Sequence, residues 1–154
     1  MENEAFGNNT FYELVPAETA TQRTQTHLIF KGNILIMDDL EIIRFSLYLM
    51  LSGHGFKAHL TSNGSDAIES YIKAKDSGQP FDAVIMDLNI PGGMGGKETI
   101  KKLLEIDPEV RAIVLSGNLD DPAMTNYWEY GFKGALHKPY VENELIQTLY
   151  EIIQ

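Results

Sequence analysis

The feature that most constrains the fold of this chain is the continuous apolar run Ala83–Met86, which ends in one carboxylate, Asp87. An uninterrupted apolar run predicts a strand buried on both faces, as in a parallel sheet covered by helices. Open parallel sheets place their chemistry at the carboxyl ends of their strands. Asp87 is therefore a candidate functional residue, although a solvated aspartate after an ordinary strand would give the same local pattern.

Strand and helix patterns alternate five times after residue 32. The predicted strands are Asn33–Met37, Phe56–Leu60, Ala83–Met86, Val110–Leu115 and Gly134–His137. The predicted helices run from Leu40 to Ser52, Asp66 to Asp76, Lys97 to Ile106, Asp121 to Tyr130 and Glu142 to Ile153. This alternation predicts an α/β fold: a doubly wound, flavodoxin-like parallel sheet of five strands in the order 2-1-3-4-5, with five helices.

Composition limits the functions that the chain can have. Its 154 residues are 44% hydrophobic, enough for one domain with its own core. A formal net charge of -10 argues against nucleic-acid or anionic-membrane partners. The absence of cysteine excludes disulfides, thiolate metal sites and a cysteine nucleophile. Because neither a membrane-span nor a signal-peptide pattern is present, we expect a cytoplasmic protein.

Residues 1–32 differ in composition from the rest of the chain. They are rich in Thr, Asn, Gln and Glu, and the segment Thr21–Thr26 is typical of a linker. The short run Phe11–Val15 could form one strand, but it has no evident partner. We therefore expect residues 1–32 to be a tail or linker and residues 33–154 to form the folded domain.

Four of the five predicted strands end in side chains that can do chemistry. These are Asp38 and Asp39, then Asp87, then Ser116, then Lys138. In the predicted order the first and third strands are neighbours, which brings the acidic pair next to Asp87. Each residue alone has an ordinary explanation, such as an acidic pair at a helix N-terminus, but those explanations do not account for the set.

The predicted carboxylate cluster needs a compensating charge. Two carboxylates about 4 Å apart repel by roughly 4 kcal/mol at an effective dielectric constant of 20. An all-oxygen ligand set favours Mg²⁺, Mn²⁺ or Ca²⁺ over zinc or copper, and a site with few protein ligands suits Mg²⁺ best. Lys138 adds a positive charge and Ser116 a hydroxyl donor. The set predicts a pocket for a transferring phosphoryl group, with Asp87 as the nucleophile.

From about residue 32 onward the sequence resembles the receiver domain of two-component response regulators. The matching motifs are LIMDD at Leu35–Asp39, VIMDLNIP at Val84–Pro91, LSG at Leu115–Gly117 and HKPY at His137–Tyr140. The resemblance implies that Asp87 accepts a phosphoryl group from the phosphohistidine of a histidine kinase or a histidine phosphotransfer protein, and that this changes the conformation of the domain.

The resemblance also implies a role for each neighbouring residue. Mg²⁺ would bind to Asp39, Asp87 and the backbone carbonyl of Asn89, with Asp38 acting through water. Ser116 and Lys138 would contact the phosphoryl oxygens.

Three further positions carry an implied role. Asn89 and Asn118 would tune the lifetime of the phosphoaspartate, and the small Gly117 would leave the phosphoryl group reachable. The Lys138–Pro139 peptide bond would be cis.

Two features depart from the common receiver pattern. Ala135 stands where receivers usually carry an aromatic switch residue, so the usual coupling of Ser116 to a moving ring is in doubt. The glycine turn Pro91–Gly96 is one residue longer than usual and is similar to the turn in receivers fused to sensor histidine kinases. The segment Gly7–Ala17 resembles the last strand of a histidine-kinase ATP-binding domain.

These features favour an origin as the C-terminal receiver of a hybrid sensor kinase. Because the ATP-binding residues are absent, this chain is not expected to act as a kinase, only to catalyse its own phosphorylation and dephosphorylation.

Two other functions stay open on the residues alone. A Mg²⁺-dependent phosphohydrolase would also use a strand-end Asp nucleophile, but such enzymes usually carry a second acid two residues later, where this chain has Asn89. A receiver that acts only as an interaction module would not need the full acidic set. The sequence also leaves open whether the chain forms a homodimer.

Overall fold

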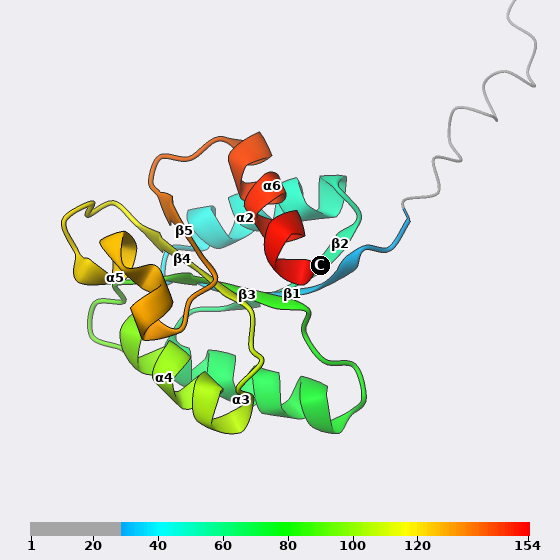
Figure 1. Ribbon diagram of the computed structural model, residues 1–154. Helices are drawn as coiled ribbons and strands as arrows, with labels where there is room; N and C mark the ends of the chain where they lie inside the picture. The colour runs from blue at the N-terminus through cyan, green and yellow to red at the C-terminus, as the bar shows by residue number, and fades with distance from the viewer. Residues whose placement is uncertain (1–28) are drawn as a thin grey trace, which may run out of the picture.

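The computed structural model describes residues 29–154, which form one five-stranded parallel sheet with helices on both faces (Figure 1). The strand order is β2-β1-β3-β4-β5. This confirms the predicted fold class and strand order. The candidate strand Phe11–Val15 and most of the predicted tail lie outside the described residues.

The helices and strands begin and end close to their predicted positions. The strands are β1 Gly32–Met37, β2 Phe56–Thr61, β3 Ala83–Asp87, β4 Ala112–Ser116 and β5 Gly134–His137. The helices are α2 Glu41–Gly53, α3 Gly64–Asp76, α4 Gly96–Ile106, α5 Pro122–Thr125 and α6 Glu142–Ile153, with a short 3₁₀ helix, η1, at Tyr127–Tyr130.

The predicted continuous helix from Asp121 to Tyr130 is wrong in its second half. Its start is as expected, because the Asp121 carboxylate accepts a hydrogen bond from the Ala123 amide at 2.9 Å and Pro122 follows the cap. The α-helix then stops at Asn126 (φ -126°, ψ 44°), and η1 follows. Thr and Asn hydrogen-bond readily to nearby backbone in non-helical conformations, which favours a break at this point.

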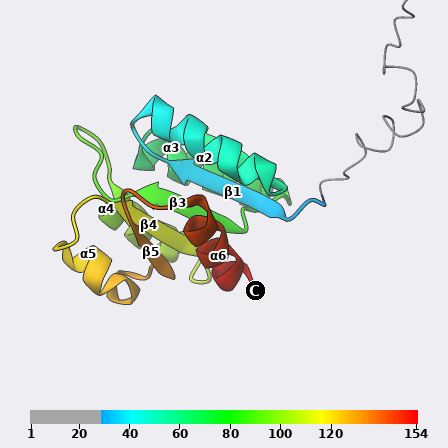
Figure 2. The ribbon, with the colours of Figure 1, turned by 90° about the horizontal axis from the view of Figure 1, so that it is seen from above.

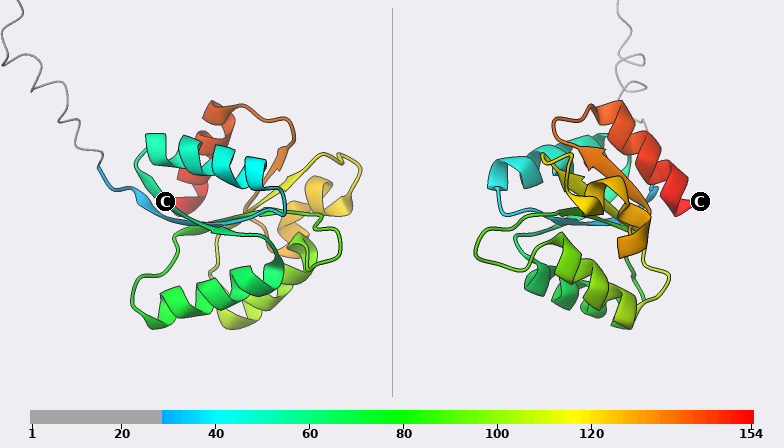
Figure 3. Two further views of the ribbon diagram at one scale, coloured as in Figure 1. Left: turned by 180° about the vertical axis from the view of Figure 1, so that it is seen from behind. Right: turned by 60° about the vertical axis from the view of Figure 1, so that its left-hand side comes forward.

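Strand β3 explains why its sequence is apolar without alternation. Val84 and Met86 lie in the core cluster under α3 and α4, whereas Ala83 and Ile85 lie in the cluster under α2 and α6. All four side chains are at most 1% exposed. Successive residues of a strand point to opposite faces, so a central strand between two helical layers must be apolar at every position. Figure 3 shows the two layers on either side of the sheet.

The strands all point the same way, so the carboxyl ends of β1 and β3 meet at one edge of the sheet (Figure 2). We call this edge, with the loops that follow each strand there, the carboxyl edge. Among residues 29–154, no helix is both long and apolar enough to span a bilayer.

The glycine turn brings α4 directly against the end of β3. A Cβ atom at Gly95 would lie 2.5 Å from the Leu88 carbonyl oxygen, and one at Gly96 would lie 2.9 Å from the Asp87 carbonyl oxygen. The Gly96 amide donates to the Leu88 oxygen at 3.0 Å. The two glycines are therefore required by close backbone contact beside Asp87.

We predict that Gly95→Ala lowers the free energy of unfolding by about 1–3 kcal/mol, because the added methyl group must push the Leu88 carbonyl aside. Gly53→Ala is the matched control, since a Cβ atom there meets nothing within 4 Å in the described structure. That variant should be unchanged or more stable by about 0.5 kcal/mol. Urea unfolding measures both, and equal stability of the two variants would contradict the close contact at Gly95.

Tyr71 makes a polar contact at the border of the core. Its side chain is 4% exposed, and its hydroxyl donates to the Asp107 carboxylate at 2.7 Å. This hydrogen bond is the main cause that lowers the pKa of Asp107. A carboxyl group whose pKa is lowered by folding stabilises the folded state above its unfolded pKa of about 4, and loses that effect as the pH falls through the lowered value.

We predict that Tyr71→Phe destabilises the protein by about 1 kcal/mol at pH 7, and that this difference from wild type shrinks as the pH falls through the pKa of Asp107. Urea unfolding at a series of pH values measures it. Tyr48→Phe is the control, because the described residues offer no hydrogen-bond partner to the half-exposed Tyr48 hydroxyl. A cost for Tyr71→Phe that is the same at every pH would contradict the coupling to Asp107.

Candidate functional site

The candidate site residues lie where three neighbouring strands end. Asp38 directly follows β1 and is fully buried, Asp87 ends β3 and is 8% exposed, and Ser116 ends β4. The parallel register pairs β1 with β3 and β3 with β4, so the three positions are adjacent along the carboxyl edge. The predicted convergence of these strand ends is therefore present in the structure.

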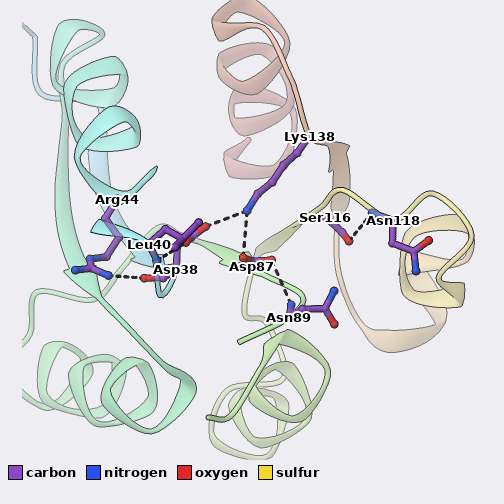
Figure 4. A network of polar contacts seen from close by, with 8 residues as sticks. All are labelled: Asp38, Leu40, Arg44, Asp87, Asn89, Ser116, Asn118 and Lys138. Carbon is purple, nitrogen blue, oxygen red and sulfur yellow. Dashed lines mark hydrogen bonds and ion pairs between the residues drawn. The ribbon is translucent and has the colours of Figure 1, made fainter. Parts of the chain in front are cut away.

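Lys138 joins two of the carboxylates. Its ammonium group lies 3.0 Å from Asp38 Oδ2 and 3.1 Å from Asp87 Oδ2 (Figure 4). Its backbone amide donates to the Ser116 carbonyl oxygen at 2.8 Å, which fixes the point where the chain leaves β5. The peptide bond from Lys138 to Pro139 is cis. The side chain thus reaches across the end of β4 to the acidic groups.

Burial and charge act in opposite directions on the two partners. Burial raises the pKa of Asp87, and the nearby Lys138 charge and the Asn89 amide offset this only in part. Burial lowers the pKa of Lys138, but the hydrogen bond to Asp38 and the charges of Asp87 and Asp38 outweigh it, so the pKa rises. Lys138 therefore stays positively charged at neutral pH.

Three carboxylates form a compact group that can hold a metal ion. Asp38, Asp39 and Asp87 each offer one oxygen, and these oxygens lie within 4.8 Å of one another. With Lys138 as the nearest positive charge, two negative charges in this group remain uncompensated. A doubly charged cation that prefers oxygen ligands fits this set in both charge and donor type. Of the three carboxylates, Asp39 is the most open to solvent.

Arg44 supports the site and was not predicted from the sequence. Its guanidinium donates to the Asp38 backbone carbonyl at 2.7 Å, while the Asp38 carboxylate accepts the Leu40 amide at 2.9 Å (Figure 4). Together these contacts fix the loop between β1 and α2. The signal that could have revealed Arg44 is its place in the first turns of the helix that follows the acidic pair.

The remaining predicted residues surround Asp87 without all contacting it. The Asn89 amide donates to Asp87 Oδ1 at 3.2 Å. The Ser116 hydroxyl accepts a hydrogen bond from the Asn118 amide at 3.1 Å, and no hydrogen bond joins it to Asp87 within the described part of the chain. The Asn118 side chain accepts from the Asp120 amide at 3.1 Å.

The small Gly117 leaves space beside Ser116, whereas Ala135 does not. A Cβ atom at Gly117 would meet nothing within 4 Å among the described residues. Ala135 on β5 is half-buried and packs against the core cluster under α3 and α4.

A model of the family described as "Response regulator receiver domain" matches residues 34–150. This covers most of the chain, so the protein belongs to that family. It is a receiver domain of two-component signalling systems.

Three curated relatives differ in how much of their length the chain spans. It is 36% identical over 120 residues to the uncharacterized transcriptional regulatory protein YesN of Bacillus subtilis. That alignment covers 78% of this chain but only 32% of YesN. It is 28% identical to the chemotaxis protein CheY of Thermotoga maritima, over 77% of this chain and 95% of CheY. It is 24% identical to the sensor kinase CckA of Brucella abortus, over 91% of this chain and 14% of CckA.

Solved structures show the same fold. The receiver domain of sensor histidine kinase PA1611 from Pseudomonas aeruginosa superposes with a TM-score of 0.69 at 24% identity, over 79% of this chain and 97% of that one. That structure is described with a magnesium ion coordinated in its active-site cleft. Receiver domains bind Mg²⁺ at their acidic site and interact with histidine kinases or phosphotransfer proteins.

We predict that Lys138→Met lowers the free energy of unfolding by about 3 kcal/mol at pH 7 in a chelator, because it leaves the two buried carboxylates unpaired. The loss should shrink as the pH falls toward the raised pKa of Asp87. The pKa of Asp87 is already raised and rises further without the ammonium group, so protonation removes the repulsion in acid. Urea unfolding at several pH values measures both effects.

Two variants control for this prediction. Lys73→Met breaks the exposed 2.8 Å pair with Glu69 and should leave stability nearly unchanged. The double variant Lys138→Met/Asp87→Asn should recover part of the loss, because it removes one of the two unpaired charges. If Lys73→Met and Lys138→Met cost the same, Lys138 is not the charge partner of the buried acids.

Proposed function

We propose that this chain is a phosphoacceptor receiver in which Asp87 accepts a phosphoryl group from a phosphohistidine. The observation that carries the proposal is the position of the Asp87 carboxylate. It lies at the carboxyl edge, 3.1 Å from the Lys138 ammonium, and its oxygens converge with those of the acidic pair Asp38 and Asp39. A nucleophile that adjoins both a fixed positive charge and a group of oxygens able to hold a cation suits phosphoryl transfer, where catalysis is positioning plus charge stabilisation.

In the proposed transfer, one Asp87 carboxylate oxygen attacks the phosphorus atom, and the bond between phosphorus and the histidine nitrogen breaks. The electron pair of that bond stays with the imidazole, which becomes neutral by taking up one proton. The product on this chain is an acyl phosphate. Lys138, now shared by Asp38 and Asp87, would turn to a phosphoryl oxygen, and the Ser116 hydroxyl would donate to another.

The residues that would hold Mg²⁺ are Asp39, Asp87 and the backbone carbonyl of Asn89, with Asp38 acting through water. Bound there, Mg²⁺ neutralises phosphoryl oxygens and lowers the repulsion between the attacking carboxylate and the phosphate. Mn²⁺ has the same preference for oxygen ligands and would substitute. Asp38 is held by its own contacts to Leu40 and Lys138, which suits a role behind the metal ligands.

Hydrolysis of the acyl phosphate would return Asp87 to its starting state. The open space at Gly117 would let water reach the phosphoryl group. The exposed Asn89 and Asn118 side chains flank that approach and would set how long the phosphoaspartate lasts.

We infer that the parent protein is a hybrid sensor kinase, and the alignment with the sensor kinase CckA supports this. The alignment with CckA covers 91% of this chain. It therefore extends upstream of residue 34, where the receiver match begins. The phosphoryl donor would then be a histidine kinase or a histidine phosphotransfer protein that meets this receiver in the cytoplasm.

We predict that incubation with Mg²⁺ and acetyl phosphate adds one phosphoryl group to the intact protein, detected by mass spectrometry. The adduct should be labile, absent in Asp87→Asn and blocked by a chelator, because the carboxylate and the cation site are both required. Asp76→Asn is the matched control, since Asp76 is exposed at the far end of α3, and this variant should be labelled like wild type.

Other outcomes would overturn the proposal. Labelling that persists in Asp87→Asn would place the acceptor elsewhere. Rapid turnover of many phosphate esters, with no adduct that lasts, would indicate a phosphohydrolase. No adduct with acetyl phosphate or with a phosphorylated histidine phosphotransfer protein would indicate an interaction module.

A further inference from the structure

Two chains of contacts leave the site along different loops. The first starts at Asp87, whose carboxylate accepts the Asn89 amide. It continues through the glycine turn, where the Gly96 amide donates to Leu88, and reaches Lys97 in the first turn of α4. Because Gly95 and Gly96 leave no room between this turn and β3, a shift of the Asp87 loop is passed directly to the start of α4.

The second chain of contacts starts at Ser116. Its hydroxyl accepts the Asn118 amide at 3.1 Å, and the Asn118 side chain accepts the Asp120 amide at 3.1 Å. Asp121 follows and caps α5 by accepting the Ala123 amide at 2.9 Å. The segment Gly117–Asp121, which we call the α5 loop, is thus organised from the site end to the helix start by side chain to backbone hydrogen bonds.

The two chains of contacts meet at an ion pair between Lys97 and Asp121. The ammonium nitrogen of Lys97 lies 2.9 Å from Asp121 Oδ1, and the Asp121 side chain is only 15% exposed. The same ammonium group lies 5.8 Å from the centre of the Tyr130 ring on η1. Lys97 therefore contacts the cap of α5 and the end of η1 from a position on α4.

Strand β5, which leads from the site toward η1, carries no large side chain at position 135. Ala135 is the β5 residue opposite Val114 in the register, and it presents only a methyl group to the core cluster under α3 and α4. Tyr127 is half-buried against that core, and Trp128 contacts it edge to face at 5.1 Å with 59% of its own surface exposed. Lys97 reaches the same region through Asp121 and the Tyr130 ring.

We propose that Lys97 is a positioning residue that, through Asp121, sets the position of the α5 loop next to Ser116 and transmits a change there to η1. This inference rests on the proposed function, because the change that it transmits is phosphorylation of Asp87. When the Ser116 hydroxyl leaves the Asn118 amide for a phosphoryl oxygen, the α5 loop moves, and Lys97 carries α5 and η1 with it. Because Trp128 lies on η1, the surroundings of its indole ring change as η1 moves.

The protein carries its own reporter for this movement, because Trp128 is its only tryptophan. Two measurements on the full chain test the proposal. The first is amide hydrogen exchange at Asn118 and Asp120 without any phosphoryl donor. The second is Trp128 emission before and after acetyl phosphate with Mg²⁺, with the adduct quantified by mass spectrometry in the same samples.

For Lys97→Met we expect about fivefold faster exchange at Asn118 and Asp120, since loss of one partly buried ion pair frees the loop to this extent. We also expect the phosphorylation-dependent change in Trp128 emission to be lost although the adduct still forms, with a phosphoaspartate lifetime changed by about threefold or more. Lys97→Arg should restore all three quantities, because it keeps the charge and the reach.

Lys102→Met is the matched control, because it removes another ion pair of α4, the 3.3 Å pair with Glu98, and should behave like wild type. Unchanged exchange and emission in Lys97→Met, or equal changes in Lys102→Met, would overturn the positioning role. If wild type forms no adduct, the proposed function fails, and the exchange rates in Lys97→Met still decide whether Lys97 positions the loop.

Discussion

The arrangement of the whole site depends on one ammonium group shared by two buried carboxylates. Asp38 is fully buried and Asp87 nearly so, and Lys138 lies within 3.1 Å of both. Buried carboxylates without a partner cost several kcal/mol, and the lysine offsets much of that cost. Yet the lysine compensates one charge of three in the group that includes Asp39. The remaining negative charge fits a divalent cation that prefers oxygen ligands, so the groups that the fold must compensate are also the ones suited to hold a metal ion.

Much of this architecture follows from the sequence for simple physical reasons. A strand such as β3, apolar at every position, can be buried only between two helical layers, and such layers require parallel strands whose carboxyl ends meet. The meeting of Asp38, Asp39, Asp87 and Lys138 is a consequence of that topology. Chemistry at strand ends is therefore visible in the sequence before any distance is known.

Contacts that depend on side-chain orientation could not be predicted in this way. Arg44 donates to the Asp38 carbonyl, and Lys97 pairs with Asp121. Both contacts join separate segments through long, flexible side chains, and the periodicity of a sequence does not specify where such side chains point. The 3₁₀ helix η1 was missed because Tyr and Trp have only slightly lower helix propensity, and the break follows from tertiary packing and from Asn126. The direction of the Ser116 hydroxyl likewise depends on the neighbouring Asn118 amide.

The glycine turn and Ala135 differ in how tightly they pack against neighbouring parts of the chain. Close backbone packing at Gly95 and Gly96 makes the junction of β3 and α4 stiff, whereas Ala135 on β5 offers only a methyl group to the core against which it packs. Close-packed contacts transmit strain, so a displacement at Asp87 is passed on where backbone atoms are in contact, as they are at Gly95 and Gly96. A receiver built in this way would direct a change at Asp87 toward α4 and the α5 loop. Lys97 stands at the point where both are joined.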